Sequence, residues 1–198
     1  MYLASTPEAN ELLERDPLAL MIAMVLDQQI PMEKAFTSPA VLCDRLGSDR
    51  LGSERAALDA AELATYQPAA LEAIFRQPPA LHRFPAAMAK RVHELCRVLV
   101  ERFDGDASAV WREAADGAEL VRRLASLPGF GTQKAQIFAA LLAKQFGVQP
   151  AGWRRATGVY GEEGSFRSVA DVVDTESLTK VRSYKQQMKA AANTNAPV

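Results

Sequence analysis

The chain has 198 residues, of which 48% are hydrophobic and 24% charged, and its formal net charge is -1. This composition excludes a disordered chain, and no uncharged apolar run approaches the roughly 18 residues that a membrane-spanning helix needs. The length is typical of one domain, so we expect a single domain over residues 1–198, arranged as two helical lobes.

The N-terminal residues and the cysteines indicate the compartment. The first 16 residues lack a basic segment followed by an apolar one, so we expect no signal peptide. The two cysteines, Cys43 and Cys96, are too few for a four-cysteine metal site and indicate no disulfide framework. We therefore expect a cytoplasmic protein with no membrane partner.

Helical periodicity dominates the sequence, and runs of alternating β-branched residues are nearly absent. The first predicted helix begins at Pro17, behind the N-cap residue Asp16, and continues until Pro31 ends it. A second helix covers residues 31–47 and is interrupted near Pro39. The next predicted helices span residues 59–66, 68–75, 85–103 and 107–114.

Two further helices are predicted to face each other across a tight turn. The first covers residues 117–127 and has Asp116 as its N-cap, and the second covers residues 132–147. The turn between them reads Pro128-Gly129-Phe130-Gly131. A connection this short makes the two helices antiparallel neighbours.

The C-terminal part is predicted to contain a loop and one more helix. Residues 158–168 are glycine-rich and are expected to form the loop. The last helix covers residues 176–192, is capped by Asp174 or Thr175, and leaves a frayed tail from about residue 193. The predicted fold class is therefore all-α, a two-lobed helical bundle.

Charge is unevenly distributed along the chain. Residues 1–62 are net acidic and residues 121–198 are net basic. Such a gradient can mark a surface that binds an anion, or it can be a solvated face without a function. The charge pattern alone leaves both interpretations open. Residues 121–157 hold no acidic residue, and their basic residues are Arg122, Arg123, Lys134, Lys144, Arg154 and Arg155.

The turn contains the most specific pattern in the sequence. Gly129 and Gly131 flank the apolar Phe130 between two helices. Glycine permits positive φ and lets another backbone approach closely, and the first amides of a helix have no partner within it. This combination is typical of a phosphate site. The alternative is an ordinary helical hairpin whose glycines only make a tight turn.

The string LPGFGTQKA, residues 127–135, resembles the helix-hairpin-helix motif of the HhH-GPD superfamily of DNA glycosylases, which act in base excision repair. Upstream, LALMIAMVLDQQIPMEKA is similar to the family's early apolar helix, and Gln28 and Gln29 match the glutamine pair at its end. The resemblance covers about residues 17–147 and places both glutamines at the cleft that contacts the base. It also implies DNA binding by the hairpin residues Pro128, Gly129, Phe130, Gly131, Thr132, Gln133 and Lys134.

The positions that carry the family's chemistry hold different residues here. In bifunctional relatives a lysine lies two positions after the second hairpin glycine, where this chain has Gln133. Lys134 comes one position later, about 100° further round the helix, so we expect it to bind phosphate or solvent. The family's aspartate would fall at Ala151. The acids that can replace it are Asp27, Glu162, Glu163 and Asp171.

The segment after the hairpin occupies the place of the family's catalytic loop. Trp153 and Tyr160 can stack on an extruded base. Arg154, Arg155 and Arg167 can bind phosphate. The resemblance therefore predicts that this segment takes part in base and backbone contacts.

Structural roles are the alternative for several of these residues. Gln28 and Gln29 can satisfy backbone groups at the polar end of a buried helix, and Trp153 can be a core aromatic. Each of the candidate acids can be a solvated surface residue.

The resemblance implies a base-excision DNA N-glycosylase that acts on a damaged or mismatched base in duplex DNA, as a monomer. Because the lysine is missing, we expect water to release the base, without lysine-based lyase activity. No iron–sulfur cluster and no metal bound by side chains are expected, but a monovalent cation can bind the hairpin backbone. A non-catalytic module that recognises damaged or distorted duplex is one alternative, and a helical interaction domain without DNA binding is another.

Overall fold

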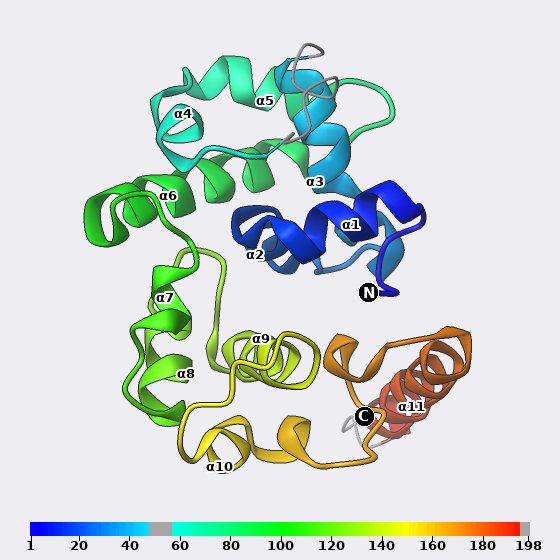
Figure 1. Cartoon of the computed structure of the whole chain (residues 1–198). Helices are drawn as coiled ribbons and strands as arrows, with labels where there is room; N and C mark the ends of the chain where they lie inside the picture. Colours follow the sequence, from blue (N-terminus) through cyan, green and yellow to red (C-terminus); the bar gives the residue numbers. More distant parts are fainter. Residues whose placement is uncertain (48–56, 195–198) are drawn as a thin grey trace.

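The computed structural model describes residues 1–47 and 57–194, and all regular structure in these ranges is helical (Figure 1). No helix within them is long and apolar enough to cross a membrane. The α-helices are α1 (Pro7–Arg15), α2 (Pro17–Leu26), α3 (Met32–Leu46), α4 (Ala60–Thr65), α5 (Pro68–Arg76), α6 (Pro85–Phe103), α7 (Ala109–Arg112), α8 (Gly117–Ala125), α9 (Thr132–Gln145), α10 (Trp153–Thr157) and α11 (Thr175–Thr194). Two 3-10 turns, η2 (Gly158–Gly161) and η3 (Val169–Asp171), lie between α10 and α11.

The first lobe, α1 to α6, is built around α2, and the second, α7 to α11, lies below it in Figure 1. Every residue from Leu18 to Leu26 is buried, so α2 is apolar on all sides. Asp16 begins α2, because its side chain accepts hydrogen bonds from the amides of Leu18 and Ala19 at 2.9 and 3.1 Å. The predicted start of this helix is therefore confirmed.

The end of α2 differs from the prediction. The helix ends at Leu26 instead of continuing towards Pro31, so Asp27, Gln28 and Gln29 lie in a loop. Gln29 has a φ of +56°, which the helical conformation excludes. The cause is a long-range contact: the ring of His82 hydrogen-bonds to the Gln28 carbonyl at 2.9 Å and holds the chain outside the helix.

Helix α3 also differs from the prediction, because it continues through Pro39 without interruption. Proline removes one backbone hydrogen bond and disfavours a helix. Here Phe36 and Leu42, on either side of Pro39, are completely buried, and burial of this face outweighs the lost bond. Ser38 adds a long-range hydrogen bond, because its hydroxyl donates to the Leu81 carbonyl at 2.9 Å.

Helix α1 was missed by the sequence analysis. Thr6 caps it by accepting a hydrogen bond from the amide of Ala9, and Pro7 occupies its first turn. Both features are helix-start signals that the sequence displays. Leu12 and Leu13 bury the inner face of this helix against the first lobe.

The C-terminal half is more regular than predicted. The glycine-rich segment 158–168 begins with the 3-10 turn η2, directly after the short helix α10. The last helix begins at Thr175 and runs to Thr194, two residues beyond the predicted end. Residues 195–198, the rest of the predicted frayed tail, lie outside the described ranges.

Candidate functional site

The α8–α9 hairpin turn packs directly on α2. Gly129 has a φ of +85°, and a Cβ atom at this position would lie 3.0 and 3.1 Å from the two methyl groups of Val25. The positive φ therefore favours glycine, and a side chain here would also require the Val25 methyl groups to shift slightly. Phe130 anchors the turn in the core, because it is buried and its ring centroid lies 5.7 Å from that of Phe138.

The start of α9 is open to the solvent. Gly131 is the N-cap residue, and no side chain caps this helix. A Cβ atom at Gly131 would meet nothing within 4 Å, and Thr132 and Gln133 are exposed. The first amides of α9 therefore face open space, and their partial positive charge suits an anionic group such as phosphate.

Lys134 does not face phosphate or solvent, contrary to the prediction. Its Nζ donates to the carbonyls of Met24 and Val25 at 2.7 and 3.1 Å, so it satisfies the C-terminal end of α2. Burial lowers the pKa of this amine to about 8, although the nearby Asp27 works against the shift. The side chain points instead to a helix that lies 110 residues away in sequence.

Gln28 and Gln29 have different surroundings. The Gln28 amide donates to the Val25 carbonyl at 2.6 Å and accepts from Arg91 at 2.9 Å, so Gln28 satisfies local groups, the structural alternative considered above. Gln29 is exposed and lies in the left-handed region. A non-glycine residue held in that region is uncommon and is found preferentially at functional sites. Gln29 is therefore the member of the pair that is free to contact a ligand.

His82 positions this loop, a role that no local sequence pattern marks. The side chain is completely buried, and its Nδ1 accepts from the amide of Phe84 at 3.0 Å. The Nε2–H therefore donates to the Gln28 carbonyl. Burial lowers the pKa of His82, so the ring is neutral near pH 7.

A cavity of about 270 Å³ lies beside the hairpin, where α9, the loop after α2, η3 and α11 meet. Its volume is close to the lower end of the range for small-molecule sites, about 300 Å³. The Gln133 amide donates to the Tyr160 hydroxyl at 2.7 Å in its wall. The polar and aromatic residues that line it include Asp27, Gln133, Tyr160, Arg167, Tyr184 and Lys185.

Asp27 is the acidic residue among the lining groups of this cavity. Burial raises the pKa of its carboxyl group, while Lys185 and Lys134 act in the opposite direction. A raised pKa caused by burial in a cavity is a common feature of functional carboxyl groups. In the described ranges, no three His, Cys, Asp or Glu side chains gather closely enough to hold a metal ion.

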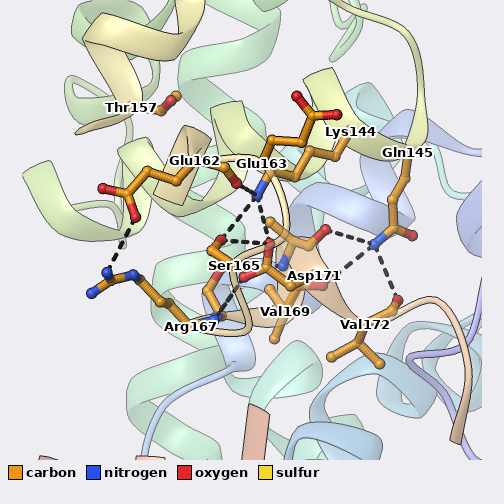
Figure 2. A network of polar contacts seen from close by, with 12 residues as sticks. Lys144, Gln145, Thr157, Glu162, Glu163, Ser165, Arg167, Val169, Asp171 and Val172 are labelled. Carbon is orange, nitrogen blue, oxygen red and sulfur yellow. Dashed lines mark hydrogen bonds and ion pairs between the residues drawn. The ribbon is translucent and has the colours of Figure 1, made fainter. Parts of the chain in front are cut away.

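Asp171, another candidate acid, has a structural role instead. Its carboxylate accepts from Lys144 Nζ at 2.5 Å and from the amides of Arg167 and Ser168 at 2.8 and 3.1 Å (Figure 2). The side chain is only 3% exposed. Asp171 therefore caps η3 and neutralises a lysine of α9, and no part of it lines the cavity.

Glu162 and Glu163 lie outside the cavity as well. Glu162 pairs with Arg167 at 3.1 Å, and Glu163 has a side chain that is 92% exposed. Exposed pairs of this kind contribute little to stability. These two acids match the surface alternative given above.

Trp153 is a core aromatic and does not line the cavity, which favours the core role over base stacking among the two alternatives given above. It starts α10 where that helix meets α8. A Cβ atom on Gly117 would lie 2.4 Å from the Trp153 Cα, so the two backbones are in direct contact. The guanidinium of Arg154 covers the outer face of the indole ring at 4.6 Å.

The basic residues of segment 121–157 do not form one surface. Arg123 pairs with Glu119 at 2.8 Å, and Lys144 pairs with the buried Asp171. Acids from outside the segment thus neutralise much of its charge. The exposed side chain of Arg155 makes no hydrogen bond or ion pair within the described part of the chain.

Comparison with known proteins gives one match. The model of the family described as HhH-GPD superfamily base excision DNA repair protein matches residues 22–196. No curated protein and no solved structure matches the chain.

Proposed function

Because the chain belongs to the HhH-GPD superfamily of base excision DNA repair proteins, we propose that it is a DNA N-glycosylase that releases a modified base from duplex DNA. The observation that carries this proposal is the cavity beside the hairpin, which has one carboxyl group, Asp27, in its wall. The open amides at the start of α9 lie next to this cavity and suit a DNA phosphate. One face of the protein therefore offers a site for the DNA backbone and a site for an extruded nucleotide.

In the proposed reaction Asp27 stabilises the transition state. Positive charge develops on the sugar as its bond to the base breaks, and an ionised carboxylate lowers the energy of that charge. Water then adds to the sugar carbon, its proton passes to solvent, and the base leaves with the electron pair of the broken bond. Because burial raises the pKa of Asp27, base release is expected to fall as the pH drops through that pKa.

The same geometry supports release without strand cleavage. The family's lyase lysine is replaced by Gln133, whose amide is engaged by Tyr160 in the cavity wall. Lys134 is turned away towards the α2 carbonyls. Neither residue 133 nor residue 134 therefore presents an amine to the cavity, so an imine between a hairpin lysine and the opened sugar is not expected.

Base release is the direct test. Purified protein would be incubated with duplexes that contain uracil, hypoxanthine, an alkylated purine, oxidised guanine or mismatched adenine, and abasic sites would be revealed by alkali. We expect release from one of these lesions, no strand break before alkali and no adduct trapped by borohydride.

Two variants assign the role of the carboxylate. Asp27→Asn should reduce the rate of base release by about 10²-fold or more while duplex binding is kept. Glu163→Gln is the matched control on an exposed acid and should leave the rate unchanged. If no lesion is processed but abasic duplex is bound, the protein is instead a non-catalytic damage-binding module.

A further inference from the structure

The segment of α11 from residue 185 to residue 191 lies at the surface of the protein. In the first half of α11, Ser177 and Val181 are buried against the second lobe. From residue 185 to residue 191 every residue is exposed. A helix in water normally owes its stability to an apolar face packed on the protein. We call residues 185–191 the α11 arm.

The arm contains two lysines and no acidic residue. No acidic residue occurs in the sequence after Glu176. The basic residues nearer the start of α11 are paired, Lys180 with Glu176 and Arg182 with Glu33. Within the described part of the chain the ammonium groups of Lys185 and Lys189 make no hydrogen bond or ion pair, although Lys185 is near enough to Asp27 to act on the pKa of that carboxyl group. Residues four apart lie on the same face of a helix.

This charged face borders the cavity beside the hairpin. Lys185 and Met188 are both in the cavity lining, together with Asp27 and Gln133. Met188 is 52% exposed, so an apolar contact is also available there. The hairpin and the arm thus approach the cavity from two different helices, α9 and α11, which both contact η3.

We propose that the α11 arm is a second DNA-binding element, in which Lys185 and Lys189 contact phosphates of the strand that feeds its nucleotide into the cavity. The proposal rests on the proposed function for its choice of partner. A polyanion that already contacts the hairpin amides would meet both ammonium groups without a competing carboxylate on the arm. Its placement at the cavity favours DNA over an unrelated acidic protein.

The salt dependence of binding tests this directly. Each phosphate contact contributes a slope of about 0.9 in a plot of log affinity against log salt concentration. Lys185→Gln/Lys189→Gln should therefore flatten the slope by about 1.8. Equivalently, the loss of affinity between 50 and 200 mM salt should shrink by about tenfold. Affinity would be measured by fluorescence anisotropy on a 20-base-pair duplex with a central abasic analogue.

A matched control removes the same charge elsewhere. Lys90→Gln/Arg97→Gln changes two exposed residues in the groove between α5 and α6, on the first lobe, and should leave the slope unchanged. An unchanged slope in the arm variant, or an equal change in the control, would overturn the proposal. Circular dichroism would verify that α11 remains helical.

Binding to an abasic analogue needs no catalysis, so the two proposals fail separately. If no base is released from any lesion but the arm variant flattens the slope, the arm stands and the glycosylase activity fails. If base is released and the slope does not change, the activity stands and the arm fails.

Discussion

Replacing Asp171 by asparagine is expected to destabilise the protein strongly. The carboxylate pairs with Lys144, which is 19% exposed, and accepts from the Ser165 hydroxyl and the amides of Arg167 and Ser168. Asparagine leaves the ammonium group uncompensated and keeps only one acceptor oxygen. Breaking a buried ion pair by removing one partner costs about 3–5 kcal/mol. Because Lys144 is partly exposed, we expect about 3 kcal/mol.

Urea-induced unfolding followed by circular dichroism measures this loss. A total stability of about 5–15 kcal/mol leaves a folded but clearly weaker variant. Glu163→Gln, on an exposed acid of the same region, should stay within about 0.5 kcal/mol of the wild type. Adding Lys144→Met to Asp171→Asn should recover part of the stability, because it removes the stranded charge. A loss below about 0.5 kcal/mol for Asp171→Asn would refute the structural role and return Asp171 to the catalytic candidates.

Three further changes test the hairpin and the cavity. Gly129→Ala should lower the free energy of unfolding, measured with urea, by about 1–2 kcal/mol because residue 129 has a positive φ. Adding Val25→Ala should not relieve this backbone strain. The lowered pKa of Lys134, about 8 against 10.5 in the unfolded chain, means that the unfolded state holds the proton longer. The free energy of unfolding should therefore rise from pH 8 to pH 10.5, and this rise should be missing in Lys134→Met. The raised pKa of Cys96, about 12, lowers the free energy of unfolding at alkaline pH, but it does so equally in the wild type and the variant. Gln133→Lys places an amine at the hairpin side of the cavity, opposite the existing Lys185, and should give an adduct with abasic DNA that borohydride traps and that the wild type does not form. Failure to trap one would show that position 133 does not reach the sugar.

Local chemistry predicted most of the helices. Asp16, Asp59 and Asp116 were recognised as capping residues, and each accepts a hydrogen bond from the amide of the helix that it begins. Such bonds join residues two or three positions apart, so the sequence displays both partners. Thr6 and Pro7 are the same kind of signal for α1, although that helix was not predicted.

The errors come from contacts between distant segments. The loop after α2 is held by His82, and Lys134 is drawn to carbonyls that precede it by about 110 residues. Neither partner is visible within a local window. The fold also distinguishes the candidate acids, because Asp27 lines the cavity whereas Asp171 forms an ion pair with Lys144. Residue type and spacing alone could not rank these two.

The hairpin and α2 behave as one stiff block, with a consequence for how damage is selected. Val25 lies against Gly129, and Lys134 ties α9 to the last turn of α2, so the two lobes cannot close around a bound duplex without breaking these contacts. The nucleic acid must then supply most of the shape change. Bending a duplex site by 40–90° costs about 1–6 kcal/mol, and less where base stacking is weak. We therefore expect the protein to prefer lesions that make the duplex easier to bend. This preference would act before any contact distinguishes one base from another.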